Sequence, residues 1–164
     1  MSPVVPAKGR ARLLLGVLAA VLAVALAGQL VLRWQDRVAD EAGRDGTDAA
    51  AVAVERLLTY DAADLAGASG EIGTLTAGPF RDEFTRLFDT LVAPAAAEQQ
   101  AVSTATIVGR SVVRAGADEV VALLFVNQVT TSTALGGDRI DAVRARVTVQ
   151  REDGRWVVTA LEQV

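Results

Sequence analysis

The fold is decided by residues 140–162, which read IDAVRARVTVQREDGRWVVTALE. Apolar and polar side chains alternate in the first half, and a period of two is typical of a β-strand with one buried face. Glu152-Asp153-Gly154 predicts a tight turn, and residues 155–162 predict the closing strand. We therefore expect an antiparallel hairpin. Its inner face carries Val143, Ala145, Val147 and Val149.

Two more strands are expected directly before this hairpin. Residues 102–114 alternate, and residues 115–118 predict a turn into the next strand. Residues 119–129 (EVVALLFVNQV) are apolar at both odd and even positions, which favours a central strand covered on both faces. Residues 130–138 are polar and predict a loop.

Helical periodicity precedes the strands. We expect one helix from Gln35 to about Gly67, firm from Ala49 onward, and a short connection over residues 71–76. The glycines in its first part predict a weakly helical stalk. Asp61 falls on the apolar stripe of this helix. The stripe consists of Val54, Leu57, Leu58 and Leu65.

A second helix is predicted to open at Gly78-Pro79, because proline suits the first helical position. Pro94 is expected to end or kink it. One face of this helix is apolar. That face consists of Phe80, Phe84, Leu87, Phe88 and Leu91. Two helices followed by about four antiparallel strands predict an α+β domain, with the helices packed on one face of a curved sheet.

Residues 13–32 (LLLGVLAAVLAVALAGQLVL) contain one polar side chain, Gln29. A helix of this length spans about 30 Å, which matches the hydrocarbon core of a bilayer. Cleavage as a signal peptide after Ala27 is the alternative. Apolarity resumes beyond that site, at residues 30–32, and this favours an uncleaved anchor.

The anchor divides the chain into a basic cytoplasmic tail (1–12), a transmembrane helix (13–32), a juxtamembrane stalk (33–48) and an extracytoplasmic domain (49–164). The count of Lys and Arg is level on the two sides of the anchor. We expect the short tail, which has three bases and no acid, to stay inside. The predicted location is the plasma membrane, in single-pass topology.

Composition excludes much chemistry. The chain has no His and no Cys, so it has no imidazole base, no conventional zinc or haem site and no disulfide. Residues 33–164 hold 13 basic and 20 acidic side chains, which argues against nucleic-acid binding. We expect no cofactor, no metal and no enzymatic activity.

The chain resembles the mammalian-cell-entry (Mce)-associated membrane proteins of actinobacterial envelopes. The resemblance rests on the anchor together with five ordered segments. They are LLTYD (57–61), LTAGPF (75–80), LFVNQV (124–129), RARVTVQREDGRW (144–156) and the terminal TALEQV. The weakly helical stalk departs from the long firm helix expected in this family.

This resemblance implies a cystatin-like cone, like that of nuclear transport factor 2, which also occurs in a subunit of type IV secretion systems. It implies a non-enzymatic role, in which the protein assembles or stabilises an Mce-type transporter of lipids (fatty acids or sterols). The expected partners are the lipid bilayer and integral components of that transporter. Two alternatives are a lipid-binding module that uses the cone pocket and an assembly subunit of a type IV-like secretion system.

Four residues are candidates for the cone pocket: Tyr60, Asp61, Asn127 and Trp156. The carboxylate of Asp61, on an apolar stripe, is a candidate acid or base, and its structural alternative is a hydrogen bond to backbone N–H groups or an ion pair with Arg81 or Arg86. The amide of Asn127 and the indole of Trp156 each have a structural alternative too, in strand register and in core packing.

Four arginines are candidates for docking: Arg110, Arg114, Arg144 and Arg146. If their strands are neighbours, they form a basic stripe on the outer face of the sheet. Such a stripe either keeps the sheet soluble or docks an acidic partner or lipid headgroups.

Overall fold

A computed structural model of the protein describes Gln29 and residues 39–135 and 137–164. The predicted basic tail, the membrane helix apart from Gln29, and residues 33–38 of the stalk lie outside the described residues. None of the helices that are described is both long enough and apolar enough to cross a membrane. Residues 39–164 form one compact unit.

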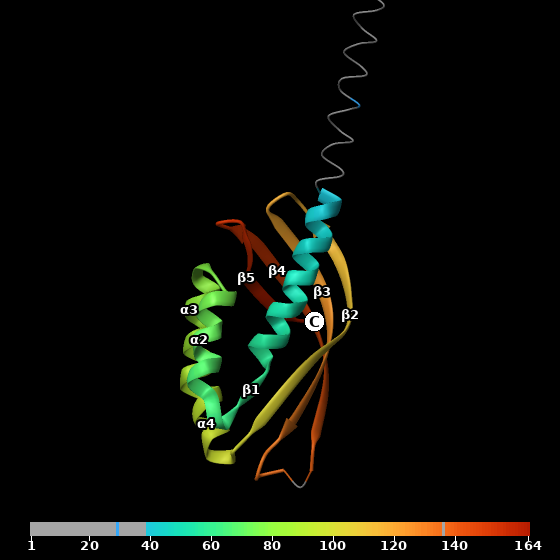
Figure 1. The fold of residues 1–164 in the computed structure, drawn as a ribbon. Coiled ribbons are helices and arrows are strands. Elements are labelled where there is room, and N and C mark those ends of the chain that lie inside the picture. The colour runs from blue at the N-terminus through green and yellow to red at the C-terminus, as the bar shows by residue number, and fades with distance from the viewer. Residues whose placement is uncertain (1–28, 30–38, 136) are drawn as a thin grey trace, which may run out of the picture. The chain divides into compact units, whose positions relative to one another are not determined.

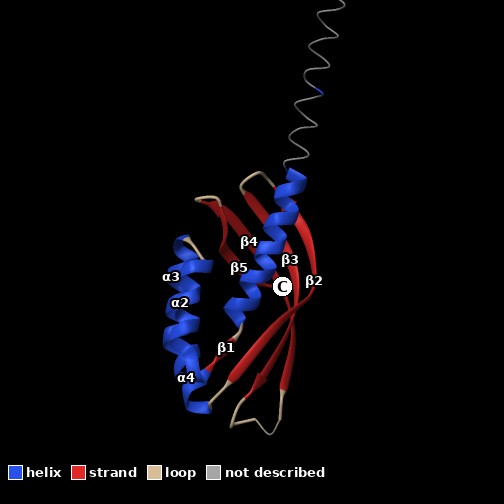
Figure 2. Cartoon of the chain, viewed as in Figure 1, coloured by secondary structure: helices blue, strands red, loops and turns tan. Residues whose placement is uncertain are grey.

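A five-stranded antiparallel sheet forms one layer of this unit (Figure 2). The strands follow one another in chain order. They are β1 (Tyr60–Asp61), β2 (Val102–Ala115), β3 (Glu119–Thr131), β4 (Arg139–Glu152) and β5 (Arg155–Gln163). The four predicted strands are confirmed, and the two-residue β1 is an addition to them. The turn after β4 has Asp153 and Gly154 at positive φ, as its sequence predicts.

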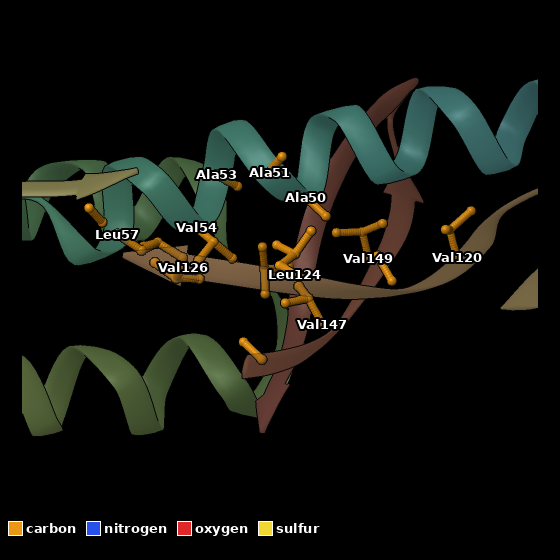
Figure 3. Close-up of a cluster of buried hydrophobic side chains, with 14 of the residues drawn as sticks. Ala50, Ala51, Ala53, Val54, Leu57, Val120, Leu124, Val126, Val147 and Val149 are labelled. Carbon is orange, nitrogen blue, oxygen red and sulfur yellow. The ribbon is translucent and has the colours of Figure 1, made fainter. Parts of the chain in front are cut away.

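The helix over residues 39–58 crosses the inner face of the sheet (Figure 1). Its buried side is made mostly of small residues, with Leu57 near its end, and Figure 3 shows this side facing Val120, Leu124 and Val126 of β3. A Cβ atom built on Gly46 would lie 2.7 Å from a methyl group of Val120, and one on Gly43 would lie 3.0 Å from the Ala115 Cβ. The prediction of a weak stalk at these glycines is therefore wrong, because here they permit close contact between helix and sheet.

The prediction of one helix running to Gly67 is also wrong. The first helix ends at residue 58, β1 follows, and a new helix α2 spans Leu65–Leu75 after the 3-10 turn η1 (Ala62–Asp64). Two carboxylates explain the break. Asp61 accepts a hydrogen bond from the Ala63 N–H at 2.8 Å, and Asp64 accepts one from the Gly67 N–H at 3.0 Å. Each therefore caps the start of a helical turn.

Helix α3 (Gly78–Leu87) begins at Gly78-Pro79, as predicted. It continues through the π-helical segment η2 (Phe88–Val92) into α4 (Ala93–Gln99), so Pro94 does not end it. Proline has no N–H to donate and crowds the preceding turn. The Ala93 N–H instead reaches back five residues to the Phe88 carbonyl. Within the predicted apolar face, Leu91 is 63% exposed and Leu87 46% exposed, whereas Phe88 is buried.

The two edges of the sheet differ. Beyond its short pairing with β1, the β2 edge is covered by polar side chains at the end of the first helix. The Thr59 hydroxyl accepts a hydrogen bond from the Ala105 N–H at 3.1 Å, and the Glu55 carboxylate accepts one from the Ile107 N–H at 3.2 Å. These bonds occupy backbone donors that would otherwise invite another strand.

Candidate functional site

The enclosed part of the interior is small, and the hollows of about 650, 300 and 310 Å³ that also border Tyr60 are more open to solvent. Between the helices and the inner face of the sheet lies a cavity of about 190 Å³. Its lining is apolar apart from Tyr60 and Gln128. The apolar lining residues are Leu57, Leu58, Phe84, Leu87, Phe88 and Val92. Pockets that bind small molecules usually enclose roughly 300–1,000 Å³, so this cavity falls below that range.

Tyr60 is the predicted pocket residue that the structure places in this cavity. Its ring meets Phe88 edge to face, with the centroids 6.2 Å apart. Beside it, the Gln128 amide donates a hydrogen bond to the Ser103 hydroxyl at 2.8 Å, and that hydroxyl donates to the Leu58 carbonyl at 3.1 Å. The Gln128 amide and the Ser103 hydroxyl beside the cavity are therefore already hydrogen-bonded within the protein.

Asp61 is exposed and lies on β1 instead of on a helical stripe. Its carboxylate caps the 3-10 turn by accepting a hydrogen bond from a backbone N–H, which is the structural role expected as the alternative to acid–base chemistry. Arg81, which the sequence also offers as its partner, donates instead to the Thr76 carbonyl and so caps the C-terminal end of α2. The geometry gives Asp61 no partner for proton transfer within the described residues.

Asn127 and Trp156 do not join Tyr60. Asn127 is exposed on the outer face of β3, where its register partners are Thr106 and Ala142. Trp156 is half-buried against the core, and the Arg151 guanidinium lies 4.7 Å from its ring centroid.

Gln128 lines the cavity, although it was not among the predicted site residues. The signal for it was available in the sequence. Gln128 has the same parity along β3 as the buried residues Leu124 and Val126, so its side chain points to the same face of the sheet.

The outer face of the sheet is the second candidate site, because no described helix packs on it. The prediction that β3 is covered on both faces is wrong on this side: Phe125 is 39% exposed, and Ile140 of β4 is 70% exposed. The Phe125 ring lies over Gly109 of β2, where an added Cβ would come within 3.2 Å of it. Residues Leu123 and Val129 are half-buried and extend this apolar surface along β3. This surface was not predicted from the sequence, because its apolar side chains were assigned to the core.

The four candidate arginines do not form one stripe. Strand β3 separates β2 from β4, and a register shift between Val112 and Arg114 turns the two arginines of β2 to opposite faces. Arg110 lies on the helix side, 3.1 Å from the Asp48 carboxylate. The predicted stripe is therefore wrong for Arg110.

The other three arginines share the outer face. Arg114 pairs with Glu119 at 2.5 Å, and Arg146 lies 3.8 Å from Glu162. Arg144 is the register partner of Phe125 and forms no ion pair with any residue that the structure describes. Its positive charge thus lies beside the exposed apolar surface.

Glu119 is held in its charged form at one end of this face. The Gln150 amide donates to its carboxylate at 2.9 Å, and Arg114 donates to the other oxygen. These hydrogen bonds, from Gln150 first and Arg114 second, hold the pKa of Glu119 below its ordinary value of 4.5. Within the described part of the chain, no three acidic side chains converge in a way that could hold a metal ion.

Comparison with solved structures defines the class of fold. The chain is similar to an IcmL-like type IV secretion system protein from Legionella pneumophila, with a TM-score of 0.62 and 11% identity over 72% of this chain and 88% of that one. It is similar to CagV, a VirB8 homologue from Helicobacter pylori, with a TM-score of 0.57 and 12% identity over 72% and 95% of the two chains. A nuclear transport factor 2-like protein from Salmonella enterica matches with a TM-score of 0.51, 9% identity and coverage of 79% and 91%. The predicted nuclear transport factor 2-like fold is confirmed.

Comparison of sequences defines the family. The chain is 32% identical to the Mycobacterium tuberculosis protein named outer membrane protein Rv1973, over 147 residues that cover 87% of this chain and 91% of the relative. It belongs to the family of that protein. It is also 31% identical to the uncharacterized protein Rv1362c of the same species, over 78% of this chain and 55% of the relative. No family model matches the chain.

Proposed function

We propose that this protein is a non-enzymatic, membrane-anchored scaffold that assembles or stabilises an Mce-type lipid-transport complex in the cell envelope. Residues 13–32 anchor it in the plasma membrane, and the domain after them lies on the extracytoplasmic side. The name of the mycobacterial relative supports an envelope location. The fold it shares with two secretion-system proteins supports a place in a multi-protein assembly.

The observation that carries this proposal is the contrast between a small enclosed cavity and an exposed apolar outer face. The cavity enclosed between the helices and the sheet measures only about 190 Å³. Apolar side chains are instead available on the outer face, at Phe125 and Ile140, with Arg144 beside them. Exposed apolar patches bordered by charge are typical of protein–protein contact sites.

The anchor makes weak contacts sufficient. A domain tethered to the membrane surface meets integral partners at a high effective concentration, so a small docking surface can hold it in place. Arg144 favours a partner that presents an acidic group beside an apolar one. In this mechanism the protein contributes binding energy and position, and no covalent step.

The test is the abundance of the transport complex in membranes. We expect a strain that lacks this protein to lose the permease and substrate-binding subunits from its membrane fraction, as measured by quantitative mass spectrometry. The full-length chain should restore them, and the variant Ile140→Glu should not. Arg155→Glu, an exposed change at the tip of the last hairpin, is the matched control and should restore them fully. Unchanged subunit levels in the deletion strain would overturn the proposal, and loss of secretion subunits instead would favour the type IV-like alternative.

A further inference from the structure

The edge of β5 differs from the covered edge of β2. Strand β5 is the last strand of the sheet, and the one strand-type pairing on the side facing away from β4, among the described residues, is a parallel bridge between Thr76 and Val158. There the Ala77 N–H donates to the Val158 carbonyl at 3.0 Å. This edge therefore already accepts an extended segment. From residue 159 to residue 163, no described strand pairs with the side of β5 that faces away from β4.

A groove of about 530 Å³ lies between this open edge and α3. Phe80 and Phe84 form one wall, with their ring centroids 5.5 Å apart, and Leu87 is 46% exposed at its end. Leu161 of β5 forms part of the opposite wall. The groove thus offers apolar side chains directly beside unpaired strand backbone, which is the arrangement that strand addition requires.

The charged side chains that line the groove favour a basic partner. Among the described residues that line it, the charged ones are Glu83 and Glu162; both are acidic, and Glu162 also lies 3.8 Å from the Arg146 guanidinium on the outer face. A second copy of this chain that paired through the same edge would bring two such acidic rims together. A basic partner would not meet that repulsion.

We propose that this groove binds an extended segment of a partner protein, in which apolar residues alternate with basic ones, as a sixth strand along β5. The apolar side chains enter the groove between α3 and β5, and the basic side chains meet Glu83 and Glu162. This site does not include the outer-face residues Ile140 and Arg144. Binding in the groove can therefore be tested independently of those residues.

The test is binding of a short fluorescent peptide of alternating valine and lysine to the full-length chain in nanodiscs of neutral lipid. Fluorescence anisotropy measures the affinity, and empty nanodiscs correct for binding to lipid. We expect Glu83→Lys to weaken binding about tenfold and the matched exposed variant Glu98→Lys, on α4, to leave it unchanged. A peptide of alternating valine and glutamate should not bind.

Backbone methylation separates strand pairing from charge attraction. Two versions of the valine–lysine peptide, N-methylated on one or the other alternate set of residues, keep the same charges but each lose one hydrogen-bonding edge. We expect one version to bind and the other to fail. Equal binding by both versions, no binding by the parent peptide, or equal loss with Glu83→Lys and Glu98→Lys would overturn the proposal and leave the scaffold function standing.

Discussion

Gly46 is the residue on which the contact between the first helix and the sheet depends most. A Cβ atom at this position would lie 2.7 Å and 2.8 Å from two carbon atoms of Val120, which is itself fully buried. Neither atom can move away without displacing the core. We expect Gly46→Ala to lower the free energy of unfolding by about 1–3 kcal/mol, as overpacking of a core does.

Gly70 is the matched control for this prediction, because it lies in a helix and an added Cβ would meet nothing within 4 Å. Alanine has the higher helix propensity, so Gly70→Ala should raise the free energy of unfolding by up to about 1 kcal/mol. Urea denaturation followed by circular dichroism measures both variants. Equal effects of the two substitutions would contradict the close packing described for Gly46.

Glu119 gives the domain a predictable response to acid. Its pKa is lowered in the folded protein, so its contribution to stability is present above its ordinary value of 4.5 and is lost as the pH falls through the folded pKa. Glu119→Gln lacks this contribution at every pH. The stability difference between the two proteins should therefore be largest above pH 4.5 and shrink below it, as measured by denaturation over a pH series. A difference that grows in acid would contradict the two hydrogen bonds assigned to this carboxylate.

At the scale of single elements, the polar cover on the β2 edge is testable. Thr59→Val removes the acceptor for the Ala105 N–H, and we expect a loss of about 0.5–1.5 kcal/mol in the free energy of unfolding. The exposed edge should also raise the tendency to aggregate, which light scattering measures. Thr74→Val is the control, because the Thr74 hydroxyl is exposed and bonds only to the carbonyl of Glu71 in its own helix. Aggregation by both variants alike would argue against an edge-specific role.

The strands could be predicted from sequence and the helix boundaries could not, for a physical reason. Alternation over residues 140–162 is a local signal that tertiary contacts did not override. The break after residue 58 depends on capping by Asp61 and Asp64, which the apolar stripe concealed. The π-helical segment before Pro94 likewise follows from a hydrogen-bond shift that a period of 3.6 residues does not reveal.

The candidate site was predictable only in part. Tyr60 does line the inner cavity, but Asn127 and Arg110 lie on the faces opposite to those expected. For Arg110 the cause is the irregular register of β2, which breaks simple alternation. The prediction of a weak stalk from the glycines of the first helix was wrong for a different reason. Helix propensity describes an isolated helix, and it does not reveal that a neighbouring sheet requires small residues at these positions.

At the scale of the whole molecule, filling the inner cavity separates scaffolding from lipid binding. Val92→Phe adds volume to a cavity of about 190 Å³ whose wall includes Val92. If the protein is a scaffold, this variant should fold and support lipid uptake as well as the unmodified chain does. Loss of uptake by a folded, membrane-bound Val92→Phe protein would favour the lipid-binding alternative.

The most direct measurement of the central claim is the amount of transport complex in membranes of strains that carry the outer-face variant Ile140→Glu with Arg144→Glu, or the cavity variant Val92→Phe. We predict that the outer-face variant is present and folded but fails to retain the complex, and that the cavity variant retains it fully. Retention of the complex by the outer-face variant, together with its loss in the cavity variant, would contradict the account.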